Sequence, residues 1–250
     1  MTATIRIIIV LTLIFNECLT LHAQQFVVSK YELGVGAGVF IYQGDLTPSR
    51  LGSYRTLKPA FNMDVNRMIS PLLSLRTNLA FGGLKGDDAK YASPAYRQQR
   101  NFNFKTPVFE LSELIVADLL RSNGSIHSFG ISPYIFTGLG FSVLKIKRDY
   151  SHFNGEYFAA ETSTIQGLAT DAQHSLPKII PVIPIGIGIK YPLSQKFMIR
   201  AETSYRFTFT DYLDGFSKAA NAARKDSYQT NTIGIIYRFV TNDTMKCPVF

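Results

Sequence analysis

The stretch that decides the fold is Phe197–Phe209, which reads FMIRAETSYRFTF. Its odd positions are mostly apolar or aromatic, whereas its even positions include Arg200, Glu202 and Arg206. A period of two residues predicts a β-strand with two unlike faces. The stretch is longer than the usual strand of about 5–6 residues and long enough for a tilted strand to cross a bilayer. Aromatic residues near both ends of its apolar face match the interfacial girdles of membrane barrels.

Seven further stretches alternate in the same way, and the connections between the eight stretches are alternately long and short. Short periplasmic turns and longer external loops are typical of outer-membrane barrels. The sequence therefore predicts an all-β fold: a single eight-stranded antiparallel transmembrane β-barrel with both termini in the periplasm. The other seven expected strands are Tyr31–Tyr42, Ala60–Met68, Leu73–Phe81, Thr106–Ala117, Phe129–Val143, Ile179–Tyr191 and Thr230–Phe239. Residues 82–105 and 145–178 are expected to be the longest loops.

The N-terminus has the pattern of a secretory signal. Arg6 precedes the apolar run Ile7–Phe15, and Ala23 is a suitable small residue before a cut. We expect a signal peptide at 1–23, a barrel at 24–239 and a periplasmic tail at 240–250. Cys247 would then be the one cysteine left, so no disulfide framework is predicted. No later segment has the roughly 18 consecutive apolar residues of a membrane helix.

Seven charged residues fall on the face opposite the apolar one. Eight strands enclose an interior that side chains nearly fill, and buried charges are costly unless they are paired. We expect a structural plug of arginine–carboxylate pairs, in preference to a proton or ion pathway, and no transport of large solutes. Glu110 and Glu113 fall on opposite faces of their strand, so one must lie near an end or in the lumen. The seven residues are Glu32, Asp64, Arg76, Arg200, Glu202, Arg206 and Arg238.

Motifs for catalysis or cofactor binding are not found in the sequence. There is no GxSxG, P-loop or HExxH. His127, His152 and His174 lack metal-ligand spacing. His152 and His174 share one expected external loop, so a barrel hydrolase stays an alternative. We expect no enzymatic activity and no cofactor.

The expected external loops carry many charges, and the whole chain has a net charge of +8. Asp45, Asp211 and Asp214 are candidate ligands for Ca²⁺, although solvated loop acids and turn caps explain them more simply. Basic residues could face the phosphates of lipopolysaccharide by charge attraction, or form a merely solvated surface. Without an aromatic–basic patch we expect no nucleic-acid partner. The basic residues are Arg50, Arg55, Lys58, Lys85, Lys90, Arg97, Arg100 and Lys105.

Several stretches resemble one known family in their order and spacing. They are Tyr31–Gly34, Tyr42–Leu46, Pro59–Phe61, Asn101–Phe104 with Glu110–Ser112, Ser132–Gly140, Thr210–Ser217 and Lys246–Phe250. Over essentially the whole mature chain, the sequence resembles the PorG-like outer-membrane barrels of the Bacteroidota type IX secretion system. The His-Ala-Gln-Gln end of the signal, at 22–25, also fits exported proteins of that phylum.

The resemblance implies a non-enzymatic outer-membrane component of a machine that exports proteins, including gliding adhesins. It also implies association with the periplasmic ring and motor proteins of that machine. We expect the tail to contact them through Lys246, Cys247, Pro248 and Phe250. Many small barrels of this phylum share the same architecture. A general barrel that binds lipopolysaccharide or passes small solutes is therefore the alternative.

Overall fold

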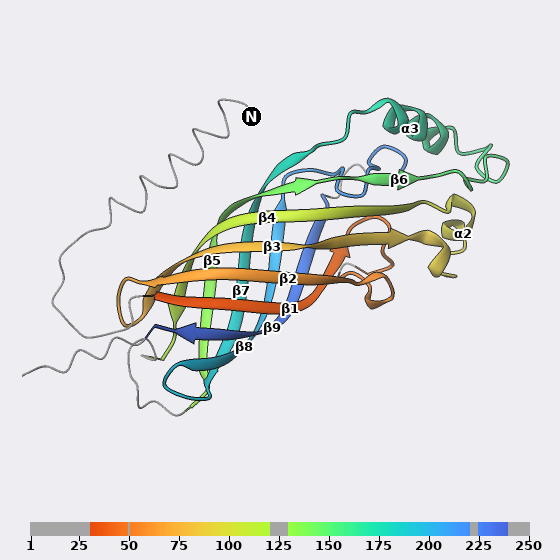
Figure 1. Ribbon diagram of the computed structural model, residues 1–250. Coiled ribbons are helices and arrows are strands. Elements are labelled where there is room, and N and C mark those ends of the chain that lie inside the picture. Colours follow the sequence, from red (N-terminus) through yellow and green to blue (C-terminus); the bar gives the residue numbers. More distant parts are fainter. Residues whose placement is uncertain (1–30, 50, 121–129, 221–224, 240–250) are drawn as a thin grey trace, which may run out of the picture.

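Eight antiparallel strands form a closed barrel in the computed structural model, which describes residues 31–49, 51–120, 130–220 and 225–239 (Figure 1). The barrel strands are β1 (Tyr31–Gln43), β2 (Lys58–Met68), β3 (Leu73–Asp87), β4 (Asn103–Asp118), β5 (Ser132–Leu144), β7 (Ile179–Pro192), β8 (Phe197–Thr208) and β9 (Ser227–Arg238). The predicted fold is thus confirmed. The expected signal peptide and the tail, with Lys246, Cys247, Pro248 and Phe250, lie outside the described residues.

Each barrel strand is hydrogen-bonded to two neighbours, and the pairing of β3 with β4 closes the sheet. Around the barrel the order is β3, β2, β1, β9, β8, β7, β5 and β4. A ninth strand of three residues, β6 (Lys147–Asp149), pairs with β4 beyond the end of β5. Closure gives each barrel strand a neighbour on both sides along the apolar band, which is what a β-structure in lipid requires.

The outer face of the barrel is mostly apolar along the middle of its strands. Val35, Met63, Leu139, Ile187 and Ile233 are all exposed there. Aromatic side chains lie near both ends of this band: Phe61, Phe81 and Phe109 occupy one cross-strand row, and Phe197 faces Tyr237 at the other end. This is the outer surface of a membrane barrel, with a lipid-facing band between two aromatic girdles.

The connection between β3 and β4 contains more regular structure than the sequence indicates. Residues 82–105 are not one long loop, because β3 continues to Asp87 and β4 begins at Asn103. Polar residues such as Lys85 and Lys105 break the apolar alternation, yet their backbones pair across the two strands. Alternation marks strands only where lipid lies on one side, so it fails to predict strands that continue beyond the membrane.

The long connections gather at one end of the barrel, which we call the long-loop end. They contain two short 3₁₀-helices, η1 (Tyr54–Thr56) and η2 (Asp88–Lys90), and two α-helices, α2 (Tyr96–Arg100) and α3 (Thr162–Gln173). Figure 1 shows β3, β4 and β6 extending toward this end, where α2 and α3 lie. In the described part of the chain, the helices are all too short or too polar to span a membrane.

Candidate functional site

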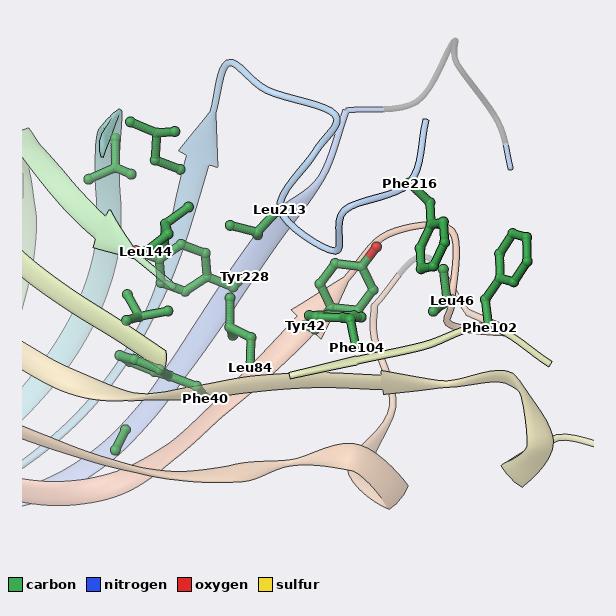
Figure 2. Close-up of a cluster of buried hydrophobic side chains, with 14 of the residues drawn as sticks. Phe40, Tyr42, Leu46, Leu84, Phe102, Phe104, Leu144, Leu213, Phe216 and Tyr228 are labelled. Atoms are coloured by element: carbon green, nitrogen blue, oxygen red, sulfur yellow. The ribbon is translucent and has the colours of Figure 1, made fainter. Parts of the chain in front are cut away.

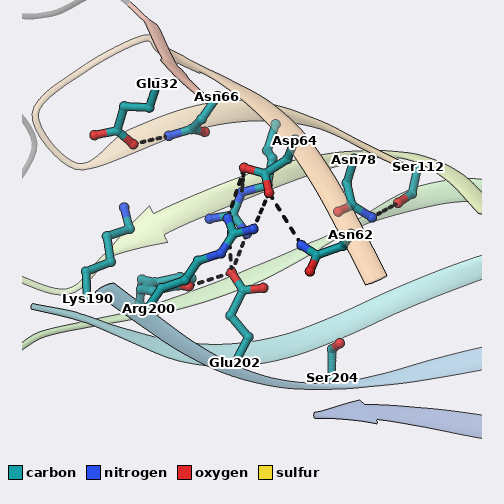
Figure 3. Close-up of polar contacts among 12 residues, drawn as sticks. Glu32, Asn62, Asp64, Asn66, Asn78, Ser112, Lys190, Arg200, Glu202 and Ser204 are labelled. Carbon is teal, nitrogen blue, oxygen red and sulfur yellow. Dashed lines mark hydrogen bonds and ion pairs between the residues drawn. The ribbon is translucent and has the colours of Figure 1, made fainter. Parts of the chain in front are cut away.

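The centre of the barrel lumen holds a layer of two carboxylates and two guanidinium groups (Figure 3). Arg200 on β8 binds Asp64 on β2 through both terminal nitrogens, with Nη1 2.9 Å from Oδ2. Arg76 on β3 donates to Glu202, which also accepts a hydrogen bond from the hydroxyl of Tyr134. The four charges are almost wholly buried and balance one another. Bidentate pairing of this kind is the arrangement that makes buried charges tolerable.

Further ion pairs lie on either side of this layer. Arg206 Nε lies 3.1 Å from Oε2 of Glu110, and Tyr228 donates to the same carboxylate at 2.7 Å. Arg238 Nε lies 3.2 Å from Oε1 of Glu32. The structure therefore places all seven sequence-predicted residues inside the barrel, with each cation close to a carboxylate.

The seven predicted residues leave out three members of the lumen network: Glu110, Asp118 and Lys190. For Glu110 the sequence indicated only that it or Glu113 lies near a strand end or in the lumen. Lys190 Nζ lies 3.1 Å from Oδ1 of Asp118, and both side chains are buried. The seven predicted residues comprise three carboxylates and four guanidinium groups, so these three additions bring the network to five charges of each sign. Strand parity could have found them, because Glu110 and Lys190 share the inward-facing parity of their strands.

Glycines on β1 make room for this network. A Cβ atom built on Gly34 would lie 2.5 Å from Asp64 Oδ2 and 2.8 Å from Arg200 Nη1. The side chains thus lie directly against the β1 backbone, and an alanine at Gly34 would collide with the ion pair. A cavity of about 20 Å³ lies beside Arg76 and Glu202, which is room for about one water molecule. Among the described residues, buried side chains occupy the centre of the lumen.

The long-loop end of the lumen is closed by an apolar cluster that the sequence did not predict (Figure 2). Phe102 and Phe216 stack with ring centroids 4.3 Å apart, and Tyr42 packs edge-on against Phe104 at 4.7 Å. Leu213, like Phe216, comes from the connection between β8 and β9, and both are buried. This connection therefore folds back over the barrel mouth. We call the buried cluster and the 210–220 segment the cap.

One buried aspartate in α3 links this helix to the cap. Asp171 in α3 accepts hydrogen bonds from the backbone N–H groups of Ser217, Lys218 and Ala219, at 2.9–3.1 Å. Gly167, one turn earlier, lets the 218–219 backbone approach, because a Cβ there would lie 2.8 Å from the Ala219 nitrogen. These hydrogen bonds thus hold the helix and the loop together.

The sequence led us to expect Arg97 and Arg100 on an outward-facing basic surface. In the structure, both contact a buried aspartate instead. Both side chains are buried and hydrogen-bonded to Asp88, with Arg97 Nη1 2.9 Å from Oδ1. They also donate to the backbone carbonyls of Thr47 and Asp45, so they join two loops of the cap region. A buried carboxylate between them attracts both guanidinium groups away from solvent. Arg50 lies outside the described residues.

Three acids near the cap differ from the solvated acids expected from sequence. Asp45 and Asp214 are buried, and Asp211 is half-buried. Asp214 Oδ1 accepts from the Phe216 backbone N–H at 2.8 Å, so it does cap a turn. No group of three or more His, Cys, Asp or Glu side chains with metal-binding geometry is found among the described residues.

The Tyr42 hydroxyl lies 2.7 Å from Oδ2 of Asp214 and 2.7 Å from Oδ1 of Asp226. A hydroxyl has one proton, so it donates to one carboxyl and accepts from the other, which must itself carry a proton. Burial raises the pKa of both aspartates well above the ordinary range, and the nearby Asp45 and Asp211 add repulsion. Burial also raises the pKa of Asp211 to about 6. The cap thus retains at least one carboxyl proton.

The histidines considered for catalysis do not form a catalytic arrangement. The His174 ring stacks on Tyr212 with centroids 4.0 Å apart, and His152 is exposed. Within the ranges that the structure describes, neither imidazole is hydrogen-bonded to a serine hydroxyl. His127 falls outside those ranges.

Glu113 is an outward-facing carboxyl within the apolar band. It lies four residues from Phe109 of one girdle along β4, and its neighbours across the strands are Thr77 and Leu139. Thr77 Oγ1 donates to Glu113 Oε2 at 2.8 Å, whereas Oε1 is buried and finds no hydrogen-bond partner among the described residues. Carboxyl groups on a lipid face are unfavourable, so this position is unlike the rest of the band.

A closed barrel with a lipid-facing apolar band, aromatic girdles and a charge-paired lumen is a transmembrane β-barrel protein. Within that class, the chain belongs to the family described as Domain of unknown function (DUF6089), whose model matches residues 6–237. No curated protein matches the sequence.

Solved barrels of similar architecture are distant in sequence. Neisserial surface protein A is 12% identical with a TM-score of 0.48, and the match covers 85% of this chain and 99% of that chain. Ail from Yersinia pestis, crystallised with the heparin analogue sucrose octasulfate, is 13% identical with a TM-score of 0.44, covering 84% and 97%. The N-terminal barrel of OprF from Pseudomonas aeruginosa is 10% identical with a TM-score of 0.38, covering 83% and 97%. Such distant likenesses carry no information about function.

Proposed function

We propose that this protein is a non-conducting outer-membrane barrel that serves as a structural subunit of the type IX secretion and gliding machinery. The observation that carries the proposal is the closed lumen. Paired charges fill its centre, from Glu32 to Arg206, and the cap fills its long-loop end. A barrel without an internal pathway acts through its surfaces, which means through partners in the membrane or in the periplasm.

Several of the sequence stretches that resemble PorG-like barrels contribute residues to the lumen or to the cap. Glu32 pairs with Arg238 in the lumen, and Gly34 lies against the Asp64–Arg200 pair. Leu46, Phe102 and Leu213 belong to the cap. The resemblance therefore supports a sealed barrel fold in common with the PorG-like barrels. The secretion role is proposed because the resemblance implies that role. The proposed partner surfaces are the short turns 69–72 and 193–196, at the end of the barrel opposite the long loops, and the tail 240–250, which is expected from the sequence to be periplasmic.

The experiment is a pull-down of the protein from outer membranes through a tag placed so that the tail stays accessible, with mass spectrometry of the co-purifying proteins. Recovery of periplasmic ring or motor subunits supports the proposal. Deletion of 240–250 should reduce that recovery, whereas Glu156→Ala, an exposed change at the long-loop end, should leave it unchanged. Recovery of a correctly inserted barrel alone, at normal abundance, would remove the secretion role and leave the fold intact.

Passage of small solutes, one of the alternatives, has no support in the filled lumen. Lipopolysaccharide binding is favoured by a separate feature on the outer wall of the barrel, which is compatible with the secretion role.

A further inference from the structure

Lysines form a cross-strand row on the outer wall of β3, β4 and β6. Lys85 is directly opposite Lys105, which is in turn directly opposite Lys147. Lys85 lies four residues from the exposed Phe81, and Lys105 lies four residues from the exposed Phe109, so both face outward as these phenylalanines do. Lys147 is opposite Lys105 and therefore also faces outward. Figure 1 shows β3, β4 and β6 running side by side in this region.

Two more lysines flank the row on the side toward the membrane. Gly83 is opposite Pro107, and the backbone N–H of Lys145 donates to the Pro107 carbonyl at 3.2 Å. On the other side, a Cβ built on Gly83 would lie 3.7 Å from Lys58 Cβ, so the Lys58 stem passes beside this glycine. Small residues thus occupy the centre and lysines surround them. We call Lys58, Lys85, Lys105, Lys145 and Lys147 the lysine wall.

The positive charge of this wall is not balanced within the described part of the chain. Lys85 Nζ lies 3.1 Å from Asp87 Oδ2, and Asp149 in the next row is hydrogen-bonded to Asn103. Lys105 and Lys147 are exposed and make no ion pair there. With Asp87 and Asp149 counted against the five lysines, the wall keeps three positive charges. Like charges directly opposite one another destabilise a sheet, so the arrangement favours a bound anion.

The distance of the lysine wall from the aromatic girdle indicates which kind of anion it binds. Phe81 and Phe109 belong to the aromatic girdle, and Lys85 and Lys105 each lie four residues further along their strands. At about 3.4 Å per residue and a tilt of roughly 40°, this is about 10 Å beyond the girdle. Aromatic girdles lie at the membrane–water interface, so the ammonium groups reach the level of lipid headgroups.

We propose that the lysine wall binds the phosphate groups of an anionic glycolipid in the outer leaflet, of the lipid A class. The inference rests on the proposed outer-membrane location with the long-loop end outside. The flexible lysine stems extend over Gly83 and Pro107 and bring their ammonium groups around one phosphate cluster. The bound lipid also covers the outer surface of the barrel between the aromatic girdle and the cap. This contact holds the extended parts of β3 and β4 against the bilayer.

The test compares unfolding of the purified barrel in phosphatidylcholine vesicles with and without lipid A. Lipid A should raise the unfolding midpoint of the wild type. The wall variant replaces three lysines by glutamine: Lys85→Gln, Lys105→Gln and Lys147→Gln. Its apparent affinity for lipid A at low salt should fall about a hundredfold, because each lysine contributes a factor of roughly five. The matched control, Lys196→Gln/Lys218→Gln/Lys225→Gln, removes the same charge from exposed positions elsewhere and should respond like the wild type.

Two features separate the proposal from a simple loss of folding. Without lipid A, the wall variant should be at least as stable as the wild type, because the cross-strand repulsion is relieved. Replacing the same three lysines by arginine should keep the lipid response. An equal lipid A response in the wall and control variants would overturn the proposal. So would an equal response to lipid A stripped of its phosphates, or an equal shift from inorganic phosphate alone. The secretion role is tested separately by the pull-down.

Discussion

Replacing Asp64 by alanine should destabilise the barrel by about 3–5 kcal/mol, because it leaves a buried guanidinium without its partner. Asp64 accepts two hydrogen bonds from Arg200 and lies 3.9 Å from Arg76. After the substitution, Glu202 alone faces both cations, and its distance to Arg200 is 3.9 Å. Hydrogen bonds to charged groups contribute about 1.5–3 kcal/mol each. The loss of two such bonds, partly compensated by Glu202, gives the same range.

The double variant Asp64→Ala/Arg200→Met should recover much of this loss, because it removes both charges and leaves Arg76 paired with Glu202. We expect a coupling energy of about 2 kcal/mol or more between the two positions. The assay is denaturant unfolding in lipid vesicles, with the folded fraction read from electrophoretic mobility without heating. Glu156→Ala is the control, because this residue is exposed on a long connection, and it should change stability by less than about 0.5 kcal/mol.

A loss below about 1 kcal/mol in Asp64→Ala would refute the reasoning. Additive effects in the double variant would refute it as well, because they would mean that Asp64 and Arg200 do not depend on one another. Either result would indicate that water reaches the lumen and screens its charges.

The remaining predictions concern the cap and the lipid-facing wall. The pKa values of the buried Asp214 and Asp226 are raised in the folded protein, so the folded state holds more protons and cap stability should fall as the pH rises above about 4, the ordinary aspartate value. Asp226→Asn should make the stability of the cap depend less on pH, as measured by the hydrogen-exchange protection of residues 210–220. A cap stability that rises with pH would contradict the raised pKa values of Asp214 and Asp226. Gly167→Val should speed exchange in the same segment, since its side chain would meet the Lys218 and Ala219 backbone; an unchanged rate would show that α3 does not hold the loop. Glu113→Leu should stabilise the isolated barrel in vesicles, because it removes a carboxyl from the lipid face, and destabilisation relative to Leu111→Ile would show that the Thr77 contact outweighs that cost.

Most of the barrel could be predicted from sequence because lipid imposes a strict alternation on each strand. Where the strands leave the membrane, this constraint ends. The alternation pattern therefore does not predict the extension of β3 to Asp87, the start of β4 at Asn103, or β6. The lumen network could be predicted by parity, and Lys190 was missed although it follows that rule. The cap could not, because Phe102, Leu213 and Phe216 come together only through tertiary contacts between separate loops.

The measurement that tests the sealed barrel most directly is the current through single purified barrels in planar bilayers. A lumen filled by the Asp64–Arg200 layer and closed by the cap should give no unitary steps at any applied voltage that the bilayer withstands. Steady, reproducible conductance steps in the wild type would contradict the closed lumen, and with it the argument that this barrel acts through its surfaces.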